Sequence, residues 1–453
     1  MFEKILVANR GEIAVRVIRA CKELGIKTVA VHSEPDEPSL HTKLADETVC
    51  LPGFKPADTY LNSPAIIRAA KERGARAIHP GYGYLAENWN FAQQCAEAEL
   101  VFIGPNPETI RLAGNKLRAK EMAARSGVPV IPGSSQGVAS AAEASLVARE
   151  TGYPVMIKAG AGGGGRGMRI CRDERQLREE FPIARAEAAS AFNDPTLYIE
   201  KFLPNPRHIE IQILGDRYGK VIHLGERDCT VQRRYQKLIE ESPSPALTEK
   251  MREKIGFAAL KVARLINYSN AGTVEFMLDN QNNFYFMEIN ARLQVEHPVT
   301  ELVTGIDLVK EQIRLALGEP VNYLTTSPLP RGWALECRIN AEDPGRFFLP
   351  SPGLIEHYRP PGGYGVRLDT HVYQGYHVPP CYDSLLAKLI TWGSDRETAT
   401  KTMQRALDEF VIEPVKTTIP LHKQILSDQS FIRGVYDTGY INKFIREEDD
   451  EED

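Results

Sequence analysis

The first 115 residues alternate short apolar runs with amphipathic stretches, and this alternation restricts the fold more than any other feature of the sequence. The apolar runs, each of strand length, are residues 5–8, 28–31, 77–79 and 100–103. Residues 12–24 and 64–73 carry apolar side chains at helical spacing. Strand–helix alternation of this kind builds an open parallel sheet. The first turn, residues 9–12, lacks the three glycines of a dinucleotide-binding loop, so we infer no nicotinamide site.

The composition is that of a globular chain with several domains. The chain has 453 residues, 42% of them hydrophobic and 25% charged, which corresponds to about three domains. Glycine and proline number 35 and 30, too few for a collagen-like or low-complexity chain. Residues 447–453 are all acidic, and without them the net charge of −5 becomes slightly positive. This distribution does not favour nucleic-acid binding, and the acidic end is expected to be a disordered tail.

Cysteine usage and the apolar runs point to a cytoplasmic protein. The seven cysteines are scattered and form no Cys-x-x-Cys pair, which is typical of a reducing compartment without disulfides or a zinc site. The first expected strand starts at residue 5, which leaves no room for a signal peptide. No apolar run approaches the ~18 residues of a membrane span.

The rest of the chain divides into three further segments. Residues 131–203 have a strand–loop–strand–helix–strand order of their own. Residues 207–340 contain mixed strands and a long helical pattern at 248–265. Beyond residue 353, strands punctuated by glycine and proline are followed by a helix at 396–410. No internal repeat or long linker separates these segments.

A glycine-rich stretch is the strongest local motif. Six of the eight residues at 160–167 are glycine, and strand-like runs lie on both sides, so we expect a hairpin with a flexible crown. Such a crown lets backbone N–H groups converge on phosphate oxygens. Lys158 enters the loop and Arg166 lies within it, which favours a nucleotide lid over a mobile surface loop. It is no P-loop, because no Gly-Lys-Ser/Thr closes it.

A second motif places polar side chains at every second position. These residues are Glu288, Asn290, Arg292, Gln294 and Glu296. In an extended strand they share one face, and the preceding apolar run at 284–287 favours a central strand over a solvent-facing edge strand. Residues 272–278 form the expected partner strand, with residue 279 paired to 284, so that Glu275 faces Glu288. A one-residue slip would separate the two carboxylates.

This second motif has the chemistry of a metal and anion site. Two facing carboxylates with Asn290 form a set of hard oxygen ligands that suits Mg²⁺. Arg292 can grip a small carboxylate-like anion, and Glu296 is available as a base. Other polar candidates have no strong claim on their own: Lys116, Glu200, Lys201, His208, Lys237 and Arg338.

Taken together, the motifs resemble biotin carboxylase, an ATP-grasp family of the biotin-dependent carboxylases. The matching stretches are residues 8–14, 79–88, 158–168, 288–298 and 380–389, and the resemblance covers residues 1–446. It implies an α/β and α+β multidomain fold. The expected parts are an N-terminal open parallel-sheet domain (1–114), an ATP-grasp domain (115–330) with a mobile glycine-rich lid (131–203), a C-terminal mixed β domain with helices (331–446) and the acidic tail (447–453).

The resemblance also implies roles for individual residues. ATP binding is expected of Lys116, Lys158, Gly163, Gly164, Gly165, Glu200, Lys201, Leu203, His208, Gln232, Glu275 and Glu288. Two Mg²⁺ or Mn²⁺ ions are expected at Glu275, Glu288 and Asn290. The bicarbonate pocket corresponds to Lys237, Arg292, Gln294 and Val295. Glu296 matches the base, with Arg292, Lys237 and Arg338 as further catalytic residues, and Tyr82 and Arg338 match the biotin site.

The implied reaction is ATP- and bicarbonate-dependent carboxylation of biotin at N1′ through carboxyphosphate, the first half-reaction of acetyl-CoA carboxylase. The sequence has no Ala-Met-Lys-Met-type attachment site, so biotin is expected on a separate carrier protein, with separate carboxyltransferase subunits. A homodimer is expected through the helix with Arg16, Arg19 and Glu23 and through residues 362–367. No nucleic-acid or membrane partner is expected.

Three alternatives remain open. The first is the equivalent subunit of a pyruvate or propionyl-CoA carboxylase, which uses the same chemistry. The second is another ATP-grasp ligase, against which the anion pocket at 292–296 and Arg338 argue. The third is a non-enzymatic nucleotide-binding regulator, against which the intact acids Glu275, Glu288 and Glu296 argue.

Overall fold

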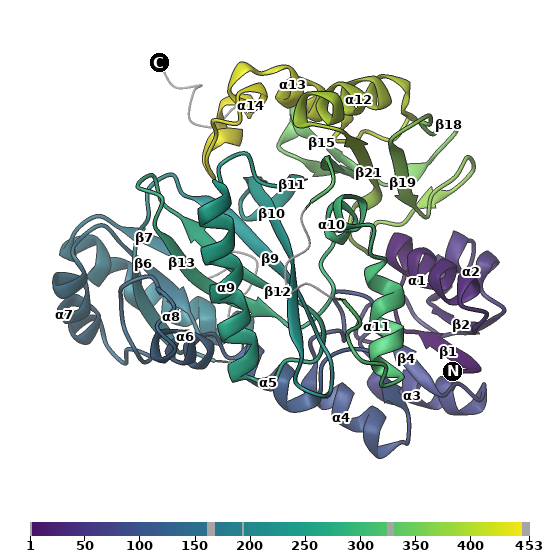
Figure 1. Ribbon diagram of the computed structural model, residues 1–453, viewed down its shortest axis with the longest axis horizontal. Coiled ribbons are helices and arrows are strands. Elements are labelled where there is room, and N and C mark those ends of the chain that lie inside the picture. The colour runs from purple at the N-terminus through teal and green to yellow at the C-terminus, as the bar shows by residue number, and fades with distance from the viewer. Residues whose placement is uncertain (1, 161–167, 193, 324–329, 446–453) are drawn as a thin grey trace.

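The computed structural model describes residues 2–160, 168–192, 194–323 and 330–445. Its N-terminal part, at the lower right of Figure 1, is a five-stranded parallel sheet in the order β3-β2-β1-β4-β5. The strands are β1 (Lys4–Val7), β2 (Lys27–His32), β3 (Glu47–Cys50), β4 (Ala77–His79) and β5 (Val101–Phe102). The helices are α1 (Gly11–Glu23), α2 (Leu40–Leu44), α3 (Ser63–Glu72) and α4 (Trp89–Glu97). The predicted parallel sheet is confirmed, with β3 as an additional edge strand.

The segment at 131–203 packs as a unit of its own at the left of Figure 1. Its sheet has the order β7-β6-β8, with β6 (Val155–Ala159), β7 (Arg169–Cys171) and β8 (Leu197–Lys201) all antiparallel. Helices α7 (Ala141–Thr151) and α8 (Glu174–Phe192) complete it. The predicted hairpin is therefore present, while its crown, including Gly163, Gly164 and Gly165, lies outside the described residues.

One antiparallel sheet runs through the rest of the molecule, in the order β13-β12-β9-β10-β11-β14-β21-β19. Its strands are β9 (Arg207–Gly215), β10 (Val221–Arg233), β11 (Gln236–Ser242), β12 (Asn270–Leu278), β13 (Phe284–Asn290), β14 (Trp333–Asn340), β19 (Val366–Thr370) and β21 (Leu385–Gly393). Helix α9 (Glu249–Leu265) lies across β9 and β10 (Figure 1) and is capped by Thr248, which accepts from the Met251 amide. The sheet crosses the predicted domain limit at 330/331, because β11 pairs with β14.

Helices close the ends and edges of this sheet. They are α5 (Pro107–Gly114), α6 (Lys116–Arg125), α10 (His297–Thr304), α11 (Leu308–Ala316), α12 (Arg396–Glu409), α13 (Ile419–Ser427) and α14 (Gln429–Ile432). Short strands are β15 (Glu342–Asp343), β16 (Leu349–Pro350), β17 (Gly353–Leu354), β18 (His357–Arg359), β20 (His377–Val378) and β22 (Val411–Glu413). The predicted helix at 396–410 is α12, which buries Ala399, Met403 and Ala406 against β21.

The β12–β13 hairpin confirms one expectation and corrects another. Glu275 pairs with Glu288, as predicted. At the turn, however, Leu278 pairs with Phe284, so the pairing expected for residue 279 is wrong. A register shift between Glu275 and Phe276 brings the two glutamates opposite each other despite the different turn.

Two further expectations about β13 are wrong. β13 is the edge strand of its sheet rather than a central one, and helices α5 and α6 pack against it, which explains its apolar run. The strand also ends at Asn290, so Arg292, Gln294 and Glu296 lie in a loop. The chain turns there because α10 begins at His297, with proline in its first turn.

None of the helices in the described ranges is both long and apolar enough to cross a bilayer. All seven cysteines are free thiols, five of them buried, whereas Cys50 and Cys381 are exposed.

The close approach of Tyr268 to β12 gives a stability prediction. A Cβ at Gly272 would overlap the Tyr268 hydroxyl oxygen, so we expect Gly272→Ala to lose about 1–3 kcal/mol. The matched control is Gly114→Ala, because a Cβ there meets no described atom within 4 Å. Thermal unfolding should give a midpoint several degrees lower for Gly272→Ala only, and equal midpoints would contradict the packing.

Candidate active site

A cavity of about 780 Å³ opens where the N-terminal sheet, the lid segment and the long sheet meet. Most of the predicted residues line it: Tyr82, Lys116, Lys158, Glu200, His208, Gln232, Lys237, Glu275, Glu288, Asn290, Arg292, Gln294, Val295 and Arg338. Three described candidates lie outside its wall. Glu296 is buried behind it, Lys201 donates to the backbone carbonyls of Gly152 and Tyr153, and Leu203 follows the end of β8.

The lid side of the cavity carries paired lysines. Lys158 Nζ lies 2.6 Å and Lys120 Nζ 2.8 Å from the two oxygens of Glu200. Burial alone would raise the pKa of Glu200, but the two lysines lower it, so the carboxylate stays ionised. Sequence reasoning missed Lys120, although it lies one helical turn after Lys116 and therefore on the same face of α6. The lysines form a cationic wall suited to phosphate.

Facing this wall is the carboxylate pair predicted for a metal. Glu275 accepts from Asn290 at 2.8 Å and from Gln294 at 3.1 Å, and its other oxygen lies 2.9 Å from His208 Nε2. Burial raises the pKa of Glu275, but the cations around it outweigh burial and hold the pKa well below its usual value. Glu288 lies 2.6 Å from Lys116 Nζ. Two carboxylates with an amide oxygen on one face of the hairpin fit Mg²⁺ or Mn²⁺.

The loop after β13 forms an anion pocket around Arg292. Arg292 Nε donates to Glu87 at 2.7 Å, and its Nη1 donates to the side chain of Gln294 at 2.9 Å. Glu87 also accepts from the Ala291 amide at 3.1 Å, which fixes the start of the loop. Sequence reasoning assigned no role to Glu87, and only its position inside the 79–88 motif could have pointed to it.

Glu296 lies under this pocket between two cations. Its Oε1 pairs with Lys237, and its Oε2 accepts from Arg338 at 2.9 Å. Burial raises the pKa of Glu296, but Lys237, Arg338 and Arg227 together lower it well below its usual value. Burial by itself would lower the pKa of Lys237. The acids around it, including Glu210, outweigh burial and raise this pKa well above its usual value. A fixed, ionised carboxylate beside an anion pocket can accept a proton from a bound acid.

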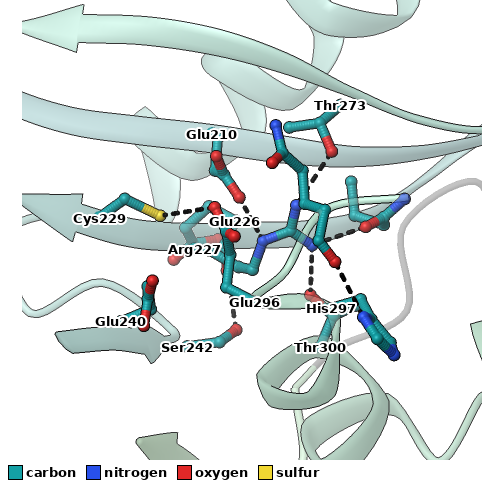
Figure 2. A network of polar contacts seen from close by, with 12 residues as sticks. Glu210, Glu226, Arg227, Cys229, Glu240, Ser242, Thr273, Glu296, His297 and Thr300 are labelled. Atoms are coloured by element: carbon teal, nitrogen blue, oxygen red, sulfur yellow. Dashed lines mark hydrogen bonds and ion pairs between the residues drawn. The ribbon is translucent and has the colours of Figure 1, made fainter. Parts of the chain in front are cut away.

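The residues below the anion pocket form the floor of the cavity, and the completely buried Arg227 holds them in place. In Figure 2, Glu210, Thr273 and Thr300 surround Arg227, and the Cys229 thiol points at Glu296. Because Glu210 also lies 2.6 Å from Lys237, Arg227 indirectly supports the lysine. The sequence shows Arg227 only as one of several cations, and its burial follows from the pairing of β9, β10 and β12.

Three family models match this chain. They are "Biotin carboxylase, N-terminal domain" at residues 1–110, "Carbamoyl-phosphate synthase L chain, ATP binding domain" at residues 115–324 and "Biotin carboxylase C-terminal domain" at residues 336–443.

Relatives match over nearly the whole length. Biotin carboxylase of Nostoc is 56% identical over 98% of this chain and 99% of its own. A pyruvate carboxylase subunit of Methanothermobacter thermautotrophicus is 52% identical over 98% of this chain and 91% of its own. A solved structure, the biotin carboxylase domain dimer of 2-oxoglutarate carboxylase from Hydrogenobacter thermophilus with MgADP, ADP and bicarbonate, has 52% identity, a TM-score of 0.95 and 98% coverage of both chains.

The parallel-sheet domain, the hairpin lid and the carboxylate pair facing a lysine wall define an ATP-grasp ligase. With biotin carboxylase domains at both ends and relatives above 50% identity, the chain belongs to the biotin carboxylase family. It is an enzyme that uses ATP and bicarbonate to carboxylate biotin. Its relatives are subunits or domains of biotin-dependent carboxylases.

The buried acids beside Arg338 give a pH prediction. Burial raises the pKa of Glu240 to about 7, although Arg338 opposes this. The folded state therefore binds a proton that the unfolded state releases above pH ~4.5, so this contribution to stability is lost as pH rises through 7.

Glu240→Gln keeps an acceptor for Arg338 Nε but cannot ionise. We expect its unfolding midpoint to fall less than that of the wild type between pH 5 and pH 8. Thermal denaturation across this range checks the expectation, and identical slopes for the two proteins would contradict it.

Proposed function

We propose that this chain is the biotin carboxylase subunit of acetyl-CoA carboxylase and acts on biotin attached to a separate carrier protein. The observation that carries the proposed catalytic roles is the position of Glu296, locked between Lys237 and Arg338 below the Arg292 pocket. Relatives that are named as subunits of larger carboxylases support a separate carrier and separate carboxyltransferase subunits. The equivalent subunit of a pyruvate or propionyl-CoA carboxylase is the second candidate, favoured by the pyruvate carboxylase relative from Methanothermobacter.

ATP is proposed to bind between the lid and the long sheet. Lys116, Lys158, Glu200, His208 and Gln232 line the cavity there, and the crown glycines 163–165 with Lys201 and Leu203 complete the proposed set. Glu275, Glu288 and Asn290 would hold the metal ions. When bound, these ions neutralise charge on the phosphate chain.

Bicarbonate is proposed to bind Arg292, Gln294, Val295 and Lys237. An anion there competes with Glu296 for the positive charge of Lys237, which raises the pKa of Glu296 and makes it a better base. Glu296 then accepts the bicarbonate proton, and the resulting dianion attacks the γ-phosphoryl group of ATP to form carboxyphosphate, with ADP as the leaving group. The lysine wall stabilises the charge that develops.

The second half of the reaction is proposed to take place near Tyr82. Carboxyphosphate breaks down to CO₂ and phosphate. Phosphate removes the proton from N1′ of biotin, and N1′ then attacks CO₂ to give carboxybiotin. Arg338 stabilises the enolate oxygen that forms, because its guanidinium reaches the cavity beside Glu296. A closed lid excludes water from the unstable intermediate.

We also propose the domain limits 1–114, 115–330, 331–446 and 447–453, a cytoplasmic location and a homodimer. Arg16, Arg19, Glu23 and Arg367 border one surface hollow, and a solved relative is described as a dimer, both of which support the homodimer. No nucleic-acid or membrane partner is proposed.

The proposed base can be tested by ADP release. With ATP and Mg²⁺, we expect release to require bicarbonate and to rise with free biotin. Glu296→Gln should lower kcat/KM for bicarbonate about 100-fold or more, with the KM for ATP unchanged, because the variant cannot accept the proton. The control is Glu241→Gln, whose side chain pairs with Arg396 instead. Equal activity of Glu296→Gln and wild type would exclude Glu296 as the base.

The parent enzyme can be tested by reconstitution. We expect the chain to transfer radiolabelled bicarbonate fastest in the presence of the biotinylated carrier and carboxyltransferase of an acetyl-CoA carboxylase, giving labelled malonyl-CoA. Faster labelling with the corresponding components for pyruvate or propionyl-CoA would favour the second candidate.

A further inference from the structure

Two sequence motifs with no assigned role meet at the wall of the cavity, which Glu12 lines. Glu12 lies in the 8–14 motif at the start of α1, and Lys388 lies in the 380–389 motif on β21. The Lys388 side chain is 0% exposed and that of Glu12 only 2%. A buried lysine is rare, because its charge must be compensated by partners inside the protein.

Lys388 has partners on both sides of the site. Its Nζ donates to the backbone carbonyl of Val295 at 2.9 Å. The same Nζ lies 3.2 Å from Oε2 of Glu12, in an ion pair without hydrogen-bond geometry. The other oxygen of Glu12 accepts from the Tyr82 hydroxyl. A continuous chain of contacts through Lys388 and Glu12 therefore joins Val295 to Tyr82, and Lys388 Nζ also lies 5.8 Å from the centroid of the Tyr82 ring.

The charged side chains opposite Lys388 are bonded to other residues, so they do not replace its contacts with Val295 and Glu12. Asp369, opposite Lys388 on β19, is held by two bonds from Arg367 at 2.9 and 2.7 Å. Arg338, opposite Lys388 on β14, is engaged by Glu240 and Glu296. Within the described ranges, Glu12 is the acid with which Lys388 forms an ion pair.

The contact with Val295 fixes the peptide that leads into Glu296. The loop 291–296 lies outside any strand, so sheet hydrogen bonds do not hold it. Removing a charged donor from a buried carbonyl destabilises that geometry by more than the loss of a neutral hydrogen bond. Displacement of Val295 would also move the adjoining Glu296 carboxylate and the proposed anion pocket.

We propose that Lys388 is a positioning residue that, together with Glu12, couples the biotin subsite at Tyr82 to the bicarbonate subsite at Val295. This inference rests on the proposed roles of Tyr82, Val295 and Glu296. When biotin binds against Tyr82, the resulting displacement is transmitted through Glu12 and Lys388 to the peptide that precedes Glu296. The pair thereby links occupancy of one subsite to the geometry of the other.

The test is Lys388→Met, which keeps the length of the side chain but removes the donor. We expect the KM for bicarbonate to rise about tenfold, with the KM for ATP within about twofold of wild type. Stimulation of ADP release by free biotin should be lost. The matched control is Arg396→Met, which unpairs the buried Glu241 on the face of β11 away from Glu240. It should lower the unfolding midpoint without changing either KM or the stimulation.

A double variant separates positioning from stability. Lys388→Met leaves the buried Glu12 without its cation, whereas Glu12→Gln combined with Lys388→Met leaves no unpaired buried charge here, because Asp369 keeps its bonds from Arg367. We expect the double variant to recover much of the thermal midpoint but to keep the raised KM for bicarbonate, because Val295 still lacks its donor. Recovery of both would overturn the proposal, since the effect would then be structural.

A crystal structure of Lys388→Met distinguishes this proposal from the assigned roles of the site. A displaced 294–296 peptide with a raised KM for bicarbonate supports the proposal. An unmoved peptide overturns it, whatever the kinetics. A displaced peptide with unchanged kinetics overturns the coupling, because it shows that Val295 has no part in bicarbonate binding. In that case the contact between Lys388 and Val295 is real, and the proposed role of Val295 has failed.

Discussion

The backbone pairing of β11 with β14 is the interaction on which the site depends. It joins the ATP-binding part of the sheet to the C-terminal part and places Glu240 opposite Glu336, two residues from Arg338. Arg338 can therefore bond Glu240 and Glu296 at once, from a strand that is remote in sequence from both. If β11 and β14 did not pair, the floor of the cavity would lose the guanidinium that fixes the base.

The floor of the cavity is stable because each of its buried charges lies next to a side chain of opposite charge. Arg227, Glu210 and Glu296 have no exposed side-chain surface, and each pairs with an opposite charge. An isolated buried charge would be strongly destabilising, whereas a fully paired one is tolerated and leaves little freedom of position. This requirement preorganises the residues around Glu296 before any substrate binds, which is how a site can stabilise developing charge without rearranging.

The two sides of the cavity are built differently. The lid has its own hydrophobic core, so Lys158 belongs to a unit distinct from the long sheet, whereas Lys116 and Lys120 lie on α6, which packs against β13. The sheet side is continuous with the C-terminal part of the molecule through the pairing of β11, β14 and β21, and this pairing holds Glu240 and Arg338. Phosphate contacts on the lid can therefore change with the lid, while the proton-transfer groups stay fixed.

Local pattern alone determined several features. The alternation of strands and helices specified the parallel sheet, because the spacing of apolar residues in a strand or a helix depends only on residues that are close in the sequence. The two apolar runs of the hairpin specified that β12 pairs with β13, whereas the facing of Glu275 and Glu288 also depends on the register shift between Glu275 and Phe276. The motifs specified the family, and most of the site residues that the resemblance implied line the cavity.

Tertiary structure decided what depends on partners far along the chain. The edge position of β13 follows from helices α5 and α6, and its end at Asn290 follows from the start of α10. The roles of Arg227 and Lys388 were equally hidden, because an arginine or lysine in a sequence is usually exposed. Their burial arises only when strands from separate segments pair and bring compensating acids within reach. The local pattern of apolar residues does not predict this long-range pairing.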